Sequence, residues 1–287
     1  MNRNFCRALL LGLTLTVAAT PLRAEQMYAT NGGSITVFDS NNPSSLFSST
    51  FQGLQTGETI VGIDLRPANG MLYGVSNQSR LYIINPGNGQ LTQVGANGAF
   101  TLTGTAFGTD FNPVPDRLRQ VSNTEQNLRI NPNDGTAIVD TPLTPAGNIV
   151  AVAYSNNFVG AASTVLYAID SIAGTLNVIS NPNGGGPINL VGSLGLGTNL
   201  DERIGFDISG LSGTAYASII VGGFTNLYTI NLSTGAATLV GNIGGSGNNF
   251  VGLTAATAVP EPSTYMLLAA GALVVFGAKR LRARRVA

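Results

Sequence analysis

Three aspartates occupy the same position in a repeated pattern, and their side chains are the best candidates for chemistry in this chain. Asp64, Asp110 and Asp207 each follow a glycine by two residues, within the short apolar segments Gly-Ile-Asp, Gly-Thr-Asp and Gly-Phe-Asp. If these segments lie side by side around an axis, the three carboxylates face a common channel. Hard oxygen ligands of this kind suit Ca²⁺, and paired carboxylates are also the groups that cleave glycosidic bonds.

The same aspartates also have a purely structural interpretation, in which they cap turns or bond to neighbouring segments. The chain lacks the Asp-x-Asp-x-Asp-Gly spacing of a calcium-binding loop, which would have specified the metal. A catalytic role would need an acid partner, for which Glu58, Glu125 and Glu202 are the candidates. The residue types alone therefore leave calcium binding, catalysis and a structural role open.

A second candidate site lies in the most distinctive stretch of the chain, residues 110–132, which is rich in arginine, aspartate and asparagine. Guanidinium groups bind carboxylates through two parallel hydrogen bonds, so an anionic sugar or another acidic ligand is one candidate partner. The alternative is a network that locks neighbouring segments together, with asparagine side chains bonded to turn backbone. The candidate ligand-binding residues are Asp64, Arg66, Asp110, Asn112, Asp116, Arg117, Arg119, Asn123, Asn127 and Arg129.

Composition excludes most familiar catalytic sites from the body of the chain. Residues 25–258 contain no cysteine, histidine, lysine or tryptophan. Ser-His, Cys-His and Ser-Lys pairs therefore cannot form there, and neither can zinc sites built on histidine or cysteine. No Gly-x-Gly-x-x-Gly motif opens a helix, so a nucleotide cofactor is not expected. We expect a non-enzymatic protein with calcium as the one cofactor to consider, and a carbohydrate-active enzyme (glycoside hydrolase or lyase) as the alternative.

The charge of the body is hidden by the two ends of the chain. The whole chain has 14 basic and 14 acidic residues, but eight of the basic residues lie before residue 25 or after residue 258. Residues 25–258 keep six arginines and thirteen carboxylates. Nucleic-acid binding needs a basic face, so an acidic body of this kind argues against a nucleic-acid partner.

The elements that must position these residues come from a fourfold repeat of short alternating strands. Segments 61–67, 107–113, 150–156 and 204–210 each begin a set of four strands separated by Asn, Gly, Pro or Ser turns. The matching positions Asp64, Asp110, Ala153, Asp207 and Thr254 fall 46, 43, 54 and 47 residues apart. Four strands about every 45 residues are typical of propeller blades.

The two ends of the body complete a fifth set of strands. Residues 250–254 are a first strand without followers, and residues 27–51 contain three followers without a first strand. Joined, they close the ring and leave no open edge. We therefore predict an all-β, five-bladed propeller over residues 25–254, with four-stranded blades. A β-sandwich and a six-bladed propeller are the alternatives.

The first 24 residues have the features of a secretory signal peptide. Arg3 and Arg7 precede an apolar run over residues 8–19, and Leu22-Arg23-Ala24 provides small-residue cleavage after Ala24. The run is too short to span a bilayer. We expect export through the Sec machinery and removal of residues 1–24.

The last 29 residues, 259–287, combine a polar motif, a short apolar segment and a basic tail. Val259-Pro260-Glu261-Pro262 follows a spacer at 255–258 and precedes the apolar residues 265–278, predicted as a helix, and the basic residues 279–285. Positive charge holds such a tail in the cytoplasm, whereas 14 apolar residues are few for a stable span. The tail resembles the PEP-CTERM sorting signal of Gram-negative bacteria. This resemblance implies transient inner-membrane association through 265–278, processing by an exosortase-like membrane protease, and a final location at the cell surface or outside the cell.

The body also resembles a known family. Gly62-Ile-Asp-Leu-Arg-Pro67, Asp110-Phe-Asn-Pro-Val-Pro-Asp-Arg-Leu-Arg119 and Gln126-Asn-Leu-Arg-Ile-Asn-Pro132 are similar to the secreted bacterial family catalogued as domain of unknown function 4394. The resemblance implies no activity. PEP-CTERM tails resemble those of proteins associated with exopolysaccharide and biofilms, so a binding or structural role towards extracellular polysaccharide or a matrix protein is the function expected here.

Overall fold

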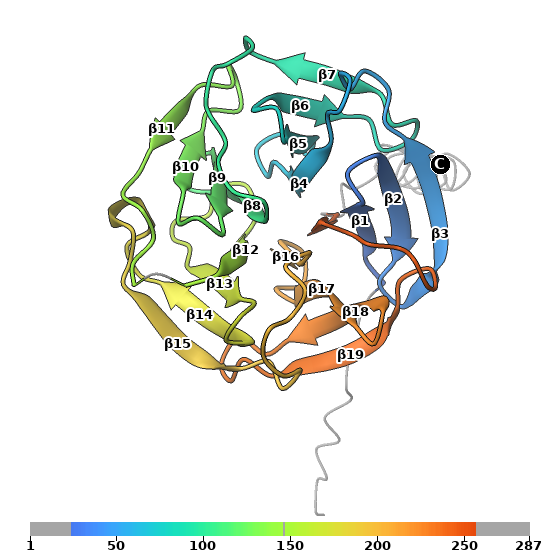
Figure 1. Ribbon diagram of the computed structural model, residues 1–287, viewed down its shortest axis with the longest axis vertical. Helices are drawn as coiled ribbons and strands as arrows, with labels where there is room; N and C mark the ends of the chain where they lie inside the picture. Colours follow the sequence, from blue (N-terminus) through green and yellow to red (C-terminus); the bar gives the residue numbers. More distant parts are fainter. Residues whose placement is uncertain (1–23, 146, 257–287) are drawn as a thin grey trace, which may run out of the picture.

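Five four-stranded antiparallel blades form a closed ring, as predicted (Figure 1). The computed structural model describes residues 24–145 and 147–256. The predicted signal peptide, the sorting motif and the C-terminal apolar helix lie outside these residues. Within them, no helix is long and apolar enough to cross a membrane.

Blade 1 joins the two ends of the chain, because β20 pairs antiparallel with β1, with Met27 opposite Ala255. Its strands, from the axis outwards, are β20 (Gly252–Ala255), β1 (Gln26–Thr30), β2 (Ser34–Asp39) and β3 (Asn42–Thr50). Blade 2 comprises β4 (Ile60–Leu65), β5 (Leu72–Ser76), β6 (Leu81–Ile84) and β7 (Leu91–Val94). Blade 3 comprises β8 (Phe107–Asn112), β9 (Arg117–Ser122), β10 (Asn127–Ile130) and β11 (Ala137–Val139).

The remaining two blades contain the least regular copy of the repeat. Blade 4 comprises β12 (Ile149–Tyr154), β13 (Leu166–Asp170), β14 (Thr175–Ile179) and β15 (Ile188–Ser193). Blade 5 comprises β16 (Gly205–Ile208), β17 (Ala215–Val221), β18 (Phe224–Ile230) and β19 (Ala237–Asn242). The described residues contain a single helical turn, the 3₁₀ helix η1 (Pro182–Gly184), between β14 and β15.

The hydrophobic core lies between neighbouring blades. One buried cluster, for example, joins Tyr73 and Val75 of β5 to Phe111, Leu118 and Leu128 of blade 3. Inner strands are buried along nearly their whole length, as in β12 and β20. Because each blade buries apolar residues on both faces, this protein needs no disulfide in residues 25–258 to hold the ring.

The turn between the third and fourth strands of a blade contacts the outer strand of the preceding blade. Gly89 and Gly135 occupy these turns at φ values of +73° and +72°. A Cβ atom at Gly89 would lie 2.3 Å from the Thr50 carbonyl oxygen, and one at Gly135 would lie 2.7 Å from the Val94 carbonyl oxygen. Glycine is required there for both its positive φ and the close approach between blades.

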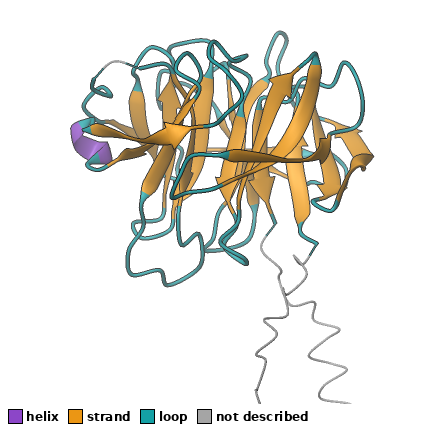
Figure 2. Ribbon diagram, turned by 90° about the horizontal axis from the view of Figure 1, so that it is seen from below, coloured by secondary structure: helices purple, strands orange, loops and turns teal. Residues whose placement is uncertain are grey.

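The ring has two distinct faces. The five innermost strands run parallel to one another, so they all begin at one face and end at the other. Since Met27 pairs with Ala255, both ends of the described chain lie at the face where the inner strands end (Figure 2). We call this the chain-end face, and the opposite one the mouth face.

Candidate functional site

The three predicted aspartates converge at the axis of the propeller. Asp64, Asp110 and Asp207 lie on the innermost strands β4, β8 and β16 and expose 1%, 0% and 1% of their surface. One carboxylate oxygen from each lies within 4.8 Å of the others. We call these three residues the axial cluster.

Each carboxylate of the axial cluster also bonds to the next inner strand. Asp64 accepts the Phe111 N–H at 2.6 Å, Asp110 accepts the Tyr154 N–H at 2.8 Å and Asp207 accepts the Ala255 N–H at 2.6 Å. Thr254 occupies the equivalent position of β20, and its hydroxyl contacts Asp64 at 2.8 Å and Asp207 at 3.0 Å. In blade 4 the position is Ala153, which has no side-chain group to bond to β16.

The glycine of the Gly-x-Asp pattern has a steric role. A Cβ atom at Gly108 would lie 2.8 Å from the Val152 nitrogen, and one at Gly205 would lie 2.5 Å from the Leu253 nitrogen. The missing side chain therefore lets adjacent inner strands approach each other, and the aspartate two residues later bonds across the contact. The Gly-x-Asp pattern, which suggested a functional site from the sequence, therefore also holds adjacent blades together.

Burial dominates the electrostatics of the axial cluster. It raises the pKa of all three carboxyl groups, because removal from water penalises the charged form. For Asp64 and Asp110, repulsion from other members of the cluster raises the pKa further. Three buried carboxylates of this kind must share protons or bind a cation.

The ten predicted ligand-binding residues do not form one patch. Four of them, Arg66, Asn112, Asp116 and Arg117, lie where β4 and β8 end and β9 begins, towards the chain-end face. The Arg66 guanidinium binds the Asp116 carboxylate through two contacts, one of 2.8 Å, and lies over the Tyr73 ring. Asn112 caps its own turn by accepting the Val114 N–H, and Arg117 donates to backbone carbonyl oxygens.

Three more of the ten form a network between blades 3 and 4. Arg119, only 1% exposed, donates to the side chains of Asn127, Asp140 and Asn183 at 2.6–2.8 Å and to the Tyr154 hydroxyl at 3.2 Å. Arg129 makes two further bonds to Asp140. The sequence identified the arginines but not their partner Asp140, which lies immediately after β11.

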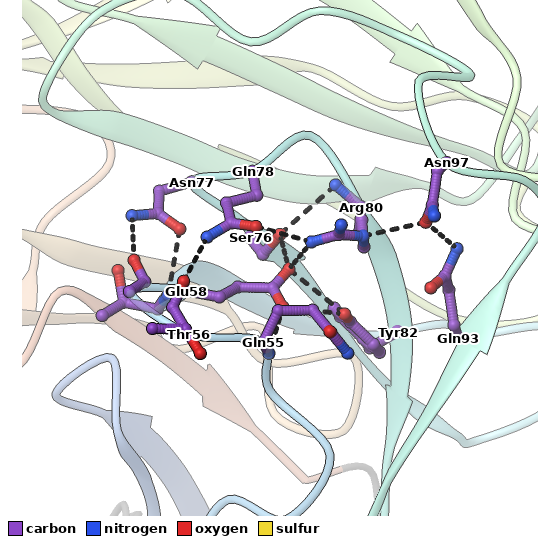
Figure 3. A network of polar contacts seen from close by, with 12 residues as sticks. Gln55, Thr56, Glu58, Ser76, Asn77, Gln78, Arg80, Tyr82, Gln93 and Asn97 are labelled. Atoms are coloured by element: carbon purple, nitrogen blue, oxygen red, sulfur yellow. Dashed lines mark hydrogen bonds and ion pairs between the residues drawn. The ribbon is translucent and has the colours of Figure 1, made fainter.

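Glu58, a candidate acid, belongs to a separate polar network in blade 2 (Figure 3). Its carboxylate accepts bonds from the Gln55 N–H, the Ser76 hydroxyl, the Arg80 guanidinium and the Tyr82 hydroxyl. Burial alone would raise the pKa of Glu58, but these bonds outweigh it and the pKa falls below its usual value. An ionised, fully bonded carboxylate is poorly suited to donate a proton.

A pocket of about 600 Å³ lies at the mouth face, at the start of the inner strands. Apolar side chains of Val61, Phe107 and Val251 form part of its lining. We call it the mouth pocket. Its polar lining residues are Asn31, Thr59, Thr105, Asp201, Glu202 and Arg203.

The charged residues of the mouth pocket are fixed by hydrogen bonds. Asp201 and Arg203 form an ion pair at 2.5 Å, and this contact lowers the pKa of Asp201. Glu202 accepts the Asn148 amide at 2.6 Å and the Asn123 amide at 3.3 Å. Asn123 is the one predicted ligand-binding residue beside this pocket. The sequence feature that could have located this pocket is Asp201-Glu202-Arg203, the only run of three charged residues in 25–258.

A small cavity lies between the mouth pocket and the axial cluster. Gly62, Gly108, Gly205 and Gly252 line a constriction of about 10 Å³, one level above the aspartates along the inner strands. This volume holds roughly one water molecule. Polymers are excluded by its size, whereas a single ion or water molecule fits.

Several solved structures are similar to this chain at low sequence identity. A chain in the crystal structure of a nidogen/laminin complex aligns with a TM-score of 0.50 at 10% identity, over 82% of this chain and 99% of that one. A structural genomics protein of unknown function from Bacteroides thetaiotaomicron gives 0.49 at 11% identity, over 75% and 57%. PorZ, a surface component of the type-IX secretion system of Porphyromonas gingivalis, gives 0.40 at 12% identity, over 75% and 26%.

Sequence comparisons place the chain in a family. No curated protein matches it. In the structural comparisons above, this chain spans only 57% of the length of the Bacteroides thetaiotaomicron protein and about a quarter of PorZ. The model for the PEP-CTERM protein-sorting motif matches residues 258–285, which marks an exported protein with a C-terminal membrane-anchoring signal handled by exosortase-type machinery. The model for the domain of unknown function DUF4394 matches residues 34–254, nearly the whole propeller, so the protein belongs to the DUF4394 family.

Proposed function

We propose that this exported propeller is a non-enzymatic binding protein, and that the mouth pocket takes a short segment of an extracellular polysaccharide. The observation that carries the proposal is the pocket of about 600 Å³ at the mouth face, which combines fixed polar side chains with an apolar lining. Ligand sites are typically concave, mostly apolar and equipped with a few oriented polar groups.

The chemistry of the pocket favours a neutral sugar. Asp201 is neutralised by Arg203, and Glu202 leaves a single excess carboxylate. Carboxylate and amide oxygens accept hydrogen bonds from sugar hydroxyl groups, while Phe107 and the aliphatic residues offer an apolar surface to a sugar ring. An acidic sugar would be repelled by Glu202. The arginines that first suggested an acidic ligand (Arg66, Arg119 and Arg129) each bind an aspartate.

The position of the pocket suits a protein that is held by its tail. The chain ends lie at the chain-end face, and the sorting motif follows β20 by only a few residues. While the tail is attached, the mouth pocket is therefore directed away from the membrane. A matrix polymer would reach it without passing between the propeller and the bilayer.

The alternative is a carbohydrate-active enzyme that uses the axial cluster. Such an enzyme needs two carboxylates on one sugar, and the axial carboxylates are at most 1% exposed behind a constriction of about 10 Å³. This geometry supports binding over cleavage by these residues. Incubation of the same polysaccharides with the protein, followed by reducing-end analysis, tests the alternative directly.

The proposal is tested by binding of the full chain, purified in mild detergent, to an array of neutral and acidic polysaccharides. We expect retention on a neutral glycan and a 10- to 100-fold weaker affinity for Glu202→Gln, since a bond to a charged acceptor contributes about 1.5–3 kcal/mol. Asp134→Asn, an exposed carboxylate in the turn after β10, is the matched control and should bind normally. Retention on no component, or equal binding by both variants, would reject the mouth pocket as the site.

A further inference from the structure

The axial cluster has two carboxylate oxygens that no group in the described part of the chain satisfies. Four of its six oxygens accept backbone N–H or Thr254 hydroxyl bonds. Asp110 Oδ2 and Asp207 Oδ1 are buried and have no hydrogen-bond partner. Buried polar atoms are nearly always bonded, and each exception needs an explanation.

The side chains around the cluster do not compensate its charge. The two remaining inner strands contribute Ala153 and Thr254 at this level, neither of which is charged. On the second strands, Tyr73, Arg119 and Tyr216 are the register partners of the three aspartates. Their polar groups are bonded elsewhere: Tyr73 to Arg66, Arg119 to Asp140 and Tyr216 to Glu25. Among the described residues, no ion pair reaches the cluster.

We propose that the axial cluster binds one calcium ion, which bridges the inner strands of blades 2, 3 and 5. One oxygen from each aspartate lies within 4.8 Å of the others, and oxygens on opposite sides of Ca²⁺ are about 5 Å apart. The cation would satisfy Asp110 Oδ2 and Asp207 Oδ1 and neutralise most of the buried charge. An ion entering from the mouth pocket would pass the glycine-lined constriction.

A shared proton is the competing explanation. A proton held between Asp110 and Asp207 would also satisfy the two orphan oxygens, without any metal. The two explanations differ at neutral pH: only a metal site gives a chelator-sensitive protein whose stability rises with added Ca²⁺. The proposal is independent of the ligand in the mouth pocket, because the aspartates lie one level below the constriction.

The experiment uses the full chain in detergent, stripped with EDTA, dialysed at pH 7.5 and titrated with CaCl₂ or MgCl₂. Elemental analysis should find one calcium per chain. At a free Ca²⁺ concentration 100 times the Kd, the melting temperature should rise by about 5–10 °C. Absence of bound calcium together with an unchanged melting temperature would overturn the proposal and leave the shared proton.

The Ca²⁺ response of aspartate variants tests whether the ion binds at the axial cluster. Asp110→Asn keeps the acceptor for the Tyr154 N–H but removes a charge, so in EDTA it should melt no lower than the parent protein and should lose the response to Ca²⁺. Asp39→Asn, an exposed carboxylate at the end of β2, is the matched control and should keep the full response. If Asp110→Asn folds and retains the calcium shift, the ion lies elsewhere and the proposal fails. If Asp110→Asn does not fold, the same measurement on Asp207→Asn decides.

Discussion

Arg119 is fully buried, yet its guanidinium group has a bonded partner on every nitrogen. Two of these partners, Tyr154 and Asn183, belong to the neighbouring blade. Replacing Arg119 by Met would leave Asp140 with Arg129 alone and would remove the donor that bonds to the side-chain oxygens of Asn127 and Asn183. Because breaking a buried ion pair typically costs about 3–5 kcal/mol, we expect a loss of that size in the free energy of unfolding, measured by urea denaturation.

Arg117→Met is the matched control for this prediction. The Arg117 guanidinium donates to the carbonyl oxygens of Pro115 and Asp116 in its own turn. Its loss should change stability by no more than about 0.5 kcal/mol. Equal effects of the two substitutions would show that the Arg119 network does not hold blades 3 and 4 together.

Glu58 makes the stability of the folded protein depend on pH, and its contacts determine the direction of that dependence. Hydrogen bonds lower the pKa of Glu58 in the folded protein despite its burial, whereas in the unfolded chain the pKa is ordinary, near 4.5. Its stabilising contribution is therefore complete above about pH 4.5 and is lost as the pH falls through the folded-state pKa. We expect Glu58→Gln to lower the free energy of unfolding by about 2–4 kcal/mol at pH 7, with a smaller difference at pH 3.5.

The comparison of Glu58→Gln with its parent at each pH isolates this group from the other titrating carboxylates. Glu125→Gln, in the turn between β9 and β10, is a control that should differ by about 0.5 kcal/mol or less. A constant difference between Glu58→Gln and its parent from pH 3.5 to 7 would mean that Glu58 stabilises the fold by packing and not by charge. The bonds drawn in Figure 3 would then contribute little.

The innermost strand of the blade contains the Gly-x-Asp pattern, and substitution of its glycine tests how closely adjacent inner strands pack. Gly108 has no positive φ, so an alanine there is strained only by the neighbouring β12 backbone, 2.8–2.9 Å from its Cβ atom. We expect Gly108→Ala to destabilise the protein by about 1–3 kcal/mol through overpacking. Thermal unfolding of both variants checks this prediction. Gly33→Ala, whose Cβ would meet one atom at 3.9 Å, should leave the stability almost unchanged. An equally stable Gly108→Ala would show that the inner strands are not in tight contact.

The strands were predictable from the sequence because each repeat has the same alternating pattern and the same turn residues. The Gly-x-Asp pattern even located the innermost strand. The mouth pocket was not predictable, because Asn31, Thr105 and Glu202 come together only when blades 1, 3 and 5 meet at the axis. Asp140 was missed for a similar reason: its arginine partners lie on β9 and β10, while it follows the short and irregular β11.

At the scale of the whole molecule, ring closure depends on one short strand from the end of the body. β20 covers the inner edge of β1, supplies Thr254 to two aspartates and packs Leu253 into the core between blades 1 and 5, where Phe250 from the preceding loop joins it. Without it, β1 would present an unpaired edge at the axis. Among the residues that the structure describes, the last backbone bond of this region is from the Ala256 N–H to the Gln26 carbonyl oxygen.

Cleavage of the tail should therefore leave the propeller unchanged, provided that the cut falls after residue 256. We expect a chain ending at residue 258 to have the same melting temperature as the full chain in the same detergent. A chain ending at residue 249 lacks β20 and should show no cooperative transition, which circular dichroism would detect. The difference between these two ends, nine residues apart, separates a removable sorting segment from a strand that closes the ring. A stable chain ending at residue 249 would contradict closure by β20, and a marked loss of stability at 258 would mean that the tail is part of the fold.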